Sequence, residues 1–238
     1  MLGTRVIVGR KAKEEAEKPF WISFADLMSA LMVLFLLVMS VALLAVTKNV
    51  SEAERRTAER AQQISTLLAR LDKAAARYPG ISIDSKRQAI DFGDRARFDT
   101  GSSQLSREQG EYLRTFVPEV LAIGRDELGR KWLKRIVVEG FADQRGDYLL
   151  NLDLSLKRSQ RVLCALLAPT AANEKALTPQ EHEQVRDLFL VGGYSFNSAR
   201  KSFEESRRIE LRLEFLDVGE SRPAVDDTQR GDFGTCRI

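Results

Sequence analysis

An apolar run from Pro19 to Val46, PFWISFADLMSALMVLFLLVMSVALLAV, holds only one ionised side chain, Asp26. A helix over residues 20–46 is about 40 Å long at about 1.5 Å per residue, which exceeds the hydrocarbon core of a bilayer, about 30 Å. A cleavable signal peptide has a shorter apolar core. The run therefore predicts an uncleaved transmembrane helix over residues 20–46. A carboxylate within such a helix costs about 2.5 to 3.5 kcal/mol, so it persists where it has a function.

Basic residues on the N-terminal side of the run predict its orientation. The first twenty residues are too few for a folded domain and carry Arg5, Arg10, Lys11, Lys13 and Lys18. Positive flanks stay on the cytoplasmic side, although the segment TKNVSEAERR after the run is also basic. We expect residues 1–19 to be a cytoplasmic tail, and the chain beyond a single inner-membrane span to lie in the periplasm.

The composition fits one membrane span and one globular domain. The chain has 238 residues, of which 44% are hydrophobic and 30% charged. Its 37 basic residues are dispersed among 34 acidic ones, for a formal net charge of +3. Because nucleic-acid binding needs a clustered basic surface, this balance argues against direct contact with DNA or RNA.

A helical linker is predicted over residues 47–80. From Lys48 to Arg77 the chain has no proline or glycine, and apolar residues recur at alternating spacings of three and four: Ala61, Ile64, Leu68, Leu71, Ala75 and Tyr78. This heptad seam is short, so it fits a contact between two copies of the chain, a helix that packs on its own domain, or a link to the membrane. Pro79 and Gly80 end the helix.

Beyond Gly80 strands and helices alternate, which predicts an α/β (α+β) domain over residues 81–217, with helices on one face of a small mixed sheet. The expected strands contain ISID, QAIDF, RIVVEGFA, DLFLVGGYS and RRIELRLEFL. The expected helices are SREQGEYLRTFVPEVLAIG, interrupted or kinked at Pro118, residues 151–167, and a helix capped by Thr178 and Glu181. Residues 218–238 are polar and are expected to form a C-terminal tail.

The stretch IVVEGFADQRGDYLLNLDLSLKRSQRVLCALL, residues 136–167, resembles the OmpA-like peptidoglycan-binding domain. The matching positions are Gly140, Asp143, Gly146, Asn151, Leu154, Ser155, Arg158 and Val162. The segments RFDTGSSQLS upstream and ESRRIELRLEF downstream extend the resemblance over roughly residues 81–217. It implies an OmpA-like fold for the periplasmic domain.

The same resemblance implies a binding site for the diaminopimelate of peptidoglycan stem peptides. In the family the motif aspartate and arginine hold this ligand, which places the site at Asp143 and Arg158, with Asn151 and Leu154 in the motif and Arg208 in support. A carboxylate suits the ammonium group, and the arginine fork suits the carboxylate. The alternative is that Asp143 and Arg158 simply pair with each other. Phe141 and Ala142 replace the family's frequent His-Thr, which predicts a more apolar pocket and altered wall binding.

The anchor, which reads Trp-x-x-x-x-Asp-Leu-Met-Ser and precedes an OmpA-like domain, resembles the MotB family of stator subunits. The resemblance implies that Asp26 carries the coupling ion. On a helix Asp26 shares a face with Ser23, Ser29, Ala30 and Val33, a narrow face suited to contact with another helix. The alternative is that Asp26 snorkels to the cytoplasmic interface without a function.

One helix cannot enclose an ion pathway, so the resemblance implies a MotA-like partner, five copies of which surround two copies of the MotB-like subunit as a homodimer. Ser23 and Ser29 could coordinate sodium, but the face is otherwise apolar and favours protons. The Met-rich segment DLMSALMVLFLLVMSVALL looks more like the B subunits of Zorya phage-defence complexes than like flagellar stators. A passive wall anchor is the alternative from another class.

Nothing in the sequence predicts an enzyme, a metal site or a cofactor. No nucleophile lies in a recognisable pattern with a base, and the single histidine, His182, lies in a polar helix. Histidine-metal chemistry and a Ser-His-Asp triad are therefore unsupported.

Both cysteines, Cys164 and Cys236, fall in the part of the chain assigned to the periplasm, where an oxidising environment permits a disulfide. The alternative is that Cys164 is a buried apolar residue and Cys236 is a free thiol in the tail. The sequence leaves these two readings open because it does not supply the geometry of a bridge.

Overall fold

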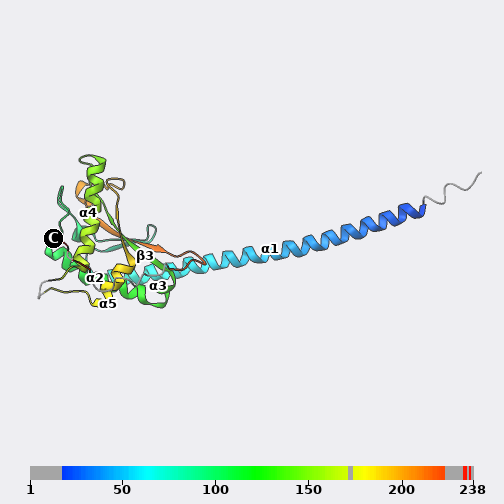
Figure 1. Ribbon diagram of the computed structural model, residues 1–238, viewed down its shortest axis with the longest axis horizontal. Coiled ribbons are helices and arrows are strands. Elements are labelled where there is room, and N and C mark those ends of the chain that lie inside the picture. The colour runs from blue at the N-terminus through cyan, green and yellow to red at the C-terminus, as the bar shows by residue number, and fades with distance from the viewer. Residues whose placement is uncertain (1–17, 171–173, 223–232, 235, 237–238) are drawn as a thin grey trace, which may run out of the picture. The chain divides into compact units, whose positions relative to one another are not determined.

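The computed structural model describes residues 18–170, 174–222, 233–234 and 236. The predicted cytoplasmic tail lies outside the described residues, apart from the first turn of helix α1 (Figure 1). The chain divides into two compact units, residues 1–56 and residues 57–238.

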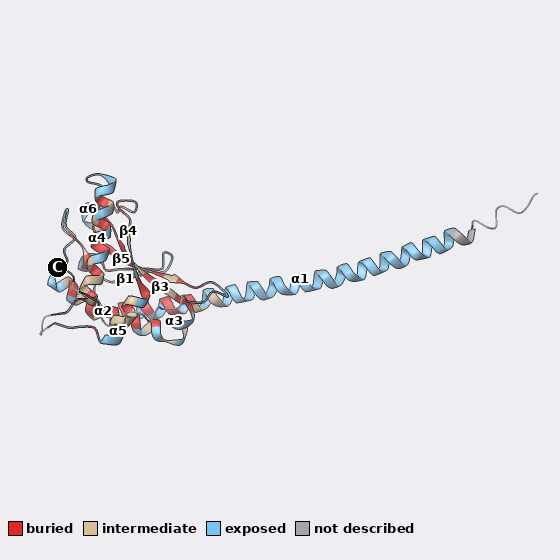
Figure 2. Cartoon of the chain, in the orientation of Figure 1, coloured by how far each residue is buried: buried red, intermediate tan, exposed pale blue. Residues whose placement is uncertain are grey.

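The described residues of the first unit form the N-terminal part of helix α1 (Lys18–Ala75). Every side chain from Trp21 to Glu59 is exposed, as the pale blue ribbon of Figure 2 shows. The hydroxyls of Ser29, Ser40 and Thr47 donate to carbonyl oxygens four residues earlier, which satisfies them within the helix. The helix is long and apolar enough to cross a membrane.

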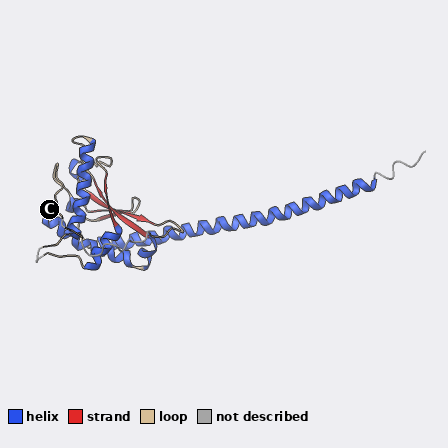
Figure 3. Cartoon of the chain, in the orientation of Figure 1, coloured by secondary structure: helices blue, strands red, loops and turns tan. Residues whose placement is uncertain are grey.

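The second unit is built on a mixed sheet of five strands, as predicted (Figure 3). The strands are β1 (Ser82–Asp84), β2 (Ala89–Asp91), β3 (Leu133–Gly140), β4 (Phe189–Gly193) and β5 (Ile209–Phe215). Their order is β1-β2-β5-β3-β4, with β3 and β4 parallel and the other neighbours antiparallel.

Helices supply the other layer of this unit. They are η1 (Gly93–Ala96), α2 (Arg107–Arg125), α3 (Glu127–Trp132), α4 (Tyr148–Leu167), α5 (Pro179–Leu188) and α6 (Phe203–Ser206). Thr178 and Glu181 form the predicted capping box at the start of α5. The predicted interruption at Pro118 is wrong, because α2 continues through this residue, which lies inside the helix; the alternative of a kink there stays a prediction. A capping box of Ser106 and Gln109 stabilises the start of α2.

The heptad seam of α1 packs on the chain's own domain. Ile64, Leu67, Leu68, Leu71 and Ala75 are buried in one core cluster with the sheet and helices α2, α4 and α5. The first predicted position of the seam, Ala61, is exposed. The folded unit therefore starts at about residue 57 rather than at residue 81, and the buried part of the seam is not a free surface for a second copy.

Helix α4 lies directly on strands β3 and β4 because two glycines permit close approach. A Cβ atom added at Gly140 would lie 1.9 Å from the Ser155 carbonyl oxygen, and one at Gly193 would lie 2.9 Å from the Ser155 hydroxyl oxygen. The Ser195 backbone N–H donates to that same hydroxyl oxygen over 3.0 Å. Ser195, in the loop after β4, also donates its hydroxyl to the Tyr148 carbonyl oxygen at the start of α4 and accepts from the Ala142 N–H, so it joins α4 to the loop that follows β3 and carries Asp143.

Candidate functional site

Asp143 lies three residues beyond the end of β3, and its carboxylate is surrounded by donors. Oδ1 accepts from the backbone N–H of Arg145 at 3.0 Å and from its Nε at 3.2 Å. Oδ2 accepts from Nη2 of Arg145 at 2.7 Å and from Nη1 of Arg207 at 3.0 Å. The Asp143 side chain is only 6% exposed.

These donors hold the Asp143 carboxylate in its charged form. The Arg145 side chain is the main cause that lowers the pKa of Asp143 to about 2, with help from the Arg145 backbone N–H and Arg207 and against the opposing effect of burial. Because the folded-state pKa lies below the unfolded value, the contribution to stability is present above pH about 4 and is lost as the pH falls towards 2. The group is ionised at neutral pH.

Arg145 is the exposed member of this cluster. Its side chain is 47% exposed, and its guanidinium lies over the Phe203 ring, 4.6 Å from the centroid. Its Nη2 also donates to the Thr100 hydroxyl at 3.1 Å. The Arg145 carbonyl oxygen accepts from Nδ2 of Asn151 at 2.8 Å, so the predicted site residue Asn151 is buried and shapes the loop.

Arg158 is buried, and the structure does not pair it with Asp143. Its Nε, Nη1 and Nη2 donate to the carbonyl oxygens of Ser102, Phe141 and Asp99 at 2.9, 2.7 and 3.1 Å. Its guanidinium lies 5.0 Å from the centroid of the Phe98 ring. Burial lowers the pKa of Arg158 to about 10, so it remains charged at neutral pH. The predicted ligand-gripping residue therefore joins separate backbone segments beneath the loop.

Arg208 does not bond to Asp143, and its expected supporting role at the site stays a prediction. Its Nε donates to Glu210 at 2.6 Å, and its guanidinium lies 4.1 Å from the centroid of the Phe141 ring. Its neighbour Arg207 reaches Asp143 instead. Arg207 is the residue at the end of α6, and Arg208 follows it immediately before β5. The sequence holds one sign that Arg208 is used elsewhere: Glu210, the carboxylate with which it pairs, lies only two residues further along the chain.

The remaining motif positions contribute packing. Phe141 and Ala142 are buried, and Phe141 stacks on Tyr194 at a centroid distance of 5.3 Å. Leu154 is half-buried on α4. The apolar replacement of the family's His-Thr pair therefore lies in the core under the loop rather than lining an open pocket.

The predicted ion-carrying residues lie on the membrane-length part of α1. Asp26, Ser23 and Ser29 are exposed, and their spacing places them on one face of the helix. The Ser29 hydroxyl donates its hydrogen to the Ala25 carbonyl oxygen at 2.8 Å. Its oxygen still has acceptor capacity.

Cys164 of α4 and Cys236 of the tail form a disulfide in the structure, with their Cα atoms 5.7 Å apart. The ring of Phe233 contacts His182 of α5 at a centroid distance of 5.5 Å. Within the tail, Cys236 is therefore attached to α4, and Phe233 lies against α5.

We expect non-reducing peptide mapping of protein alkylated in its native envelope to recover Cys164 and Cys236 as a linked pair. The bridge spans 72 residues of sequence, and a bridge of this kind contributes about 2 to 4 kcal/mol. Cys236→Ser should lower the free energy of unfolding by about that amount. Two freely alkylated thiols in the isolated protein would contradict the bridge.

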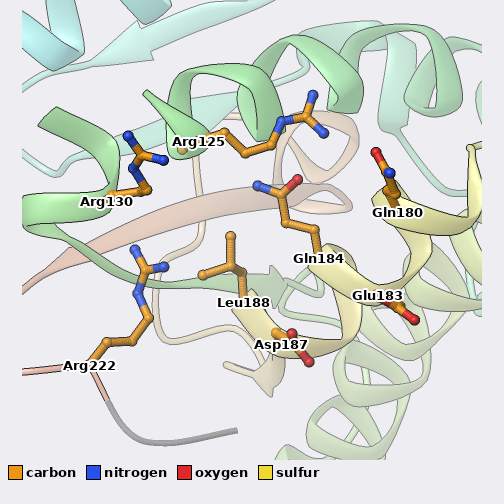
Figure 4. A pocket seen from close by; sticks show the side chains of 9 residues that line it. Arg125, Arg130, Gln180, Glu183, Gln184, Asp187, Leu188 and Arg222 are labelled. Carbon is orange, nitrogen blue, oxygen red and sulfur yellow. The ribbon is translucent and has the colours of Figure 1, made fainter. Parts of the chain in front are cut away.

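A pocket of about 390 Å³ lies elsewhere, between α2, α3 and α5 (Figure 4). Its lining includes Arg125, Arg130 and Arg222 together with Glu183 and Asp187, and none of the predicted site residues. Arg222 donates to the carbonyl oxygens of Gly129 and Leu133, which fastens the chain beside the pocket. Within the described ranges no group of three or more His, Cys, Asp or Glu side chains is placed to hold a metal ion.

Comparisons with known proteins find one family model and several solved structures that are similar to parts of the chain. Residues 9–52 match the family model described as membrane MotB of the proton-channel complex MotA/MotB. Solved structures with a similar fold include the periplasmic domain of Helicobacter pylori MotB, 15% identical with a TM-score of 0.35, covering 53% of this chain and 74% of that one. A MotB-like protein from Desulfovibrio vulgaris is 14% identical with a TM-score of 0.42, covering 66% of this chain and 93% of that one.

A full-length relative is much more similar. Over 228 residues the chain is 44% identical to the Zorya protein ZorB of Escherichia coli O139:H28 (strain E24377A / ETEC). The match covers 95% of this chain and 93% of that protein, so it includes both the membrane-length helix and the α/β domain. This chain belongs to the family of the Zorya protein ZorB.

Proposed function

We infer that this chain is the ion-carrying, wall-anchored subunit of a MotB-type stator that acts in Zorya phage defence. One observation carries this proposal: a chain of the ZorB family has a single carboxylate, Asp26, in a membrane-length apolar run. The match of residues 9–52 to the membrane segment of MotB supports the same reading. A flagellar stator is the alternative, and a test for restored motility in a strain that lacks its flagellar stator would distinguish the two.

In this proposal Asp26 binds a proton from the periplasmic side and releases it to the cytoplasm. Each proton that crosses yields about 2.3 kcal/mol per 100 mV. Protonation removes the charge of the side chain, which changes the partner surface that it prefers, and this alternation drives stepwise movement. Activity that requires sodium at a fixed membrane potential would assign sodium instead, with Ser23 and Ser29 as additional ligands.

The exposed apolar side chains of α1 are expected to contact lipid on one side and a partner protein on the other. The proposed partner is a MotA-like membrane protein, five copies of which surround a homodimer of this chain in the inner membrane. The N-terminus then lies in the cytoplasm and the α/β domain in the periplasm. Since Leu67 and Leu71 are buried in the chain's own core, we place the contact between the two copies outside the buried part of the seam.

Peptidoglycan is the proposed ligand of the α/β domain, with Asp143 as the acceptor for the ligand's ammonium group. The carboxylate is ionised at neutral pH, and it lies beside the exposed residues Arg145 and Phe203. A charge-assisted hydrogen bond to an ammonium is roughly twice as strong as a neutral one. Arg158 contributes by fixing the backbone around this acceptor.

We expect Asp143→Asn to weaken binding of the full chain to purified peptidoglycan sacculi by about tenfold or more, because the amide cannot compensate an ammonium charge. The measurement is co-sedimentation of detergent-solubilised protein with sacculi. Asp153→Asn is the matched control, since its carboxylate is 59% exposed on α4 and pairs only locally with Lys157. Equal sedimentation of wild type and Asp143→Asn would reject the site.

A further inference from the structure

The Asp143 carboxylate is fully used as an acceptor by the chain itself. An ionised carboxylate offers about four lone-pair positions. Oδ1 accepts two hydrogen bonds from Arg145, and Oδ2 accepts one from Arg145 and one from Arg207. A ligand ammonium therefore has no open position on this carboxylate until one of these donors leaves.

Of the two arginines, Arg145 is the one that is free to move. The Arg207 side chain is 10% exposed, and its Nε is held by the Phe98 carbonyl oxygen at 2.8 Å. The Arg145 side chain is 47% exposed, and its other contacts are the Phe203 ring and the Thr100 hydroxyl. Since buried ion pairs lose more when they are broken than exposed ones, a ligand displaces Arg145 more easily than Arg207.

A second carboxylate, that of Glu204, pairs with Nη2 of Arg207 at 3.4 Å and also acts electrostatically on Arg145. Glu204 of α6 is exposed, and together with Asp143 it raises the pKa of Arg145, with Asp143 as the main cause. Phe203, over which Arg145 lies, is its neighbour in the sequence. A guanidinium that leaves Asp143 can therefore still interact with the Phe203 ring and with the Glu204 carboxylate.

We propose that Arg145 is an internal competitor of the wall ligand, which occupies the ammonium position on Asp143 and must leave before an amino group of peptidoglycan binds. This inference rests on the proposed wall-binding function of the same site. Only the fraction of molecules in which Arg145 has left is competent, so the apparent affinity and association rate are reduced by that fraction. The dissociation rate of the bound ligand is unaffected.

The test is Arg145→Gln in the full chain, measured by surface plasmon resonance against an immobilised muropeptide with a free diaminopimelate amino group. We expect association about three- to tenfold faster than wild type and dissociation within about twofold, because an exposed ion pair of this kind holds the closed state only modestly. Arg145→Lys keeps the charge without the two-pronged fork and should fall between the two.

Arg125→Gln is the charge-matched control, because it removes an exposed arginine that lines the separate pocket. We expect it to bind like wild type. If wild type binds the muropeptide and Arg145→Gln associates at the same rate or more slowly, Arg145 does not compete with the ligand. Arg145 is then either without effect on binding or a direct ligand contact. A wild type that binds neither the muropeptide nor sacculi rejects wall binding itself, and the competitor with it.

Discussion

Asp26→Asn is expected to reduce phage protection to the level of cells that lack the chain. The amide keeps the size and polarity of the side chain but cannot exchange a proton, so no energy is drawn from the membrane potential. The measurement is the plating efficiency of phage on cells that carry the complete defence system with either form of the chain. A loss to background is the largest effect that we predict for any single residue.

Three controls separate ion transfer from assembly. Membrane levels of Asp26→Asn and its co-purification with the MotA-like partner should equal those of wild type. Asp26→Glu retains a titratable carboxylate and should keep part of the activity. Ser40→Ala changes a hydroxyl that bonds only within the helix, to Leu36, and should remain fully active. Full protection by Asp26→Asn would reject the motor and favour a passive wall anchor.

Arg158→Met is expected to have the second largest effect, a loss of about 3 to 5 kcal/mol in the free energy of unfolding, because each buried carbonyl oxygen left without a donor costs about 1 to 3 kcal/mol. The substitution removes the buried donors to the carbonyl oxygens of Asp99, Ser102 and Phe141. Unsatisfied buried carbonyl groups are costly, and the apolar side chain recovers only part of the packing. The measurement is urea unfolding of the purified chain in detergent, followed by tryptophan fluorescence.

Lys157→Met is the matched control, because Lys157 precedes Arg158 on the same helix and is 59% exposed in a local pair with Asp153. Its loss should stay below about 0.5 kcal/mol. Equal stability of the two variants would show that Arg158 is not a structural residue, and would return it to the role of a direct ligand contact.

Local patterns were enough to predict most of the elements. The segment RRIELRLEFL was predicted to contain a strand, and the structure places β5 (Ile209–Phe215) within it. The capping residue Thr178 correctly marked the start of α5. Both patterns involve residues only a few positions apart, so they can be recognised without knowledge of the tertiary contacts.

The features that could not be predicted from the sequence depend on contacts between residues far apart in the chain. The seam at Ile64 and Leu71 has the same spacing whether it meets a second copy or its own sheet, and only the folded core distinguishes the two. The acceptors of Arg158 lie up to 59 residues away in the sequence. Arg207 reaches Asp143 from a position 64 residues further along the chain, whereas its neighbour Arg208 bonds to Glu210.

Proton flux through the assembled complex tests the central claim most directly. The chain and its MotA-like partner would be reconstituted in liposomes that contain a pH-sensitive dye, and a membrane potential would be imposed. We predict potential-driven proton flux with wild type and none above the background of empty liposomes with Asp26→Asn. Equal flux through the two proteins would contradict the assignment of Asp26 as the residue that carries the ion.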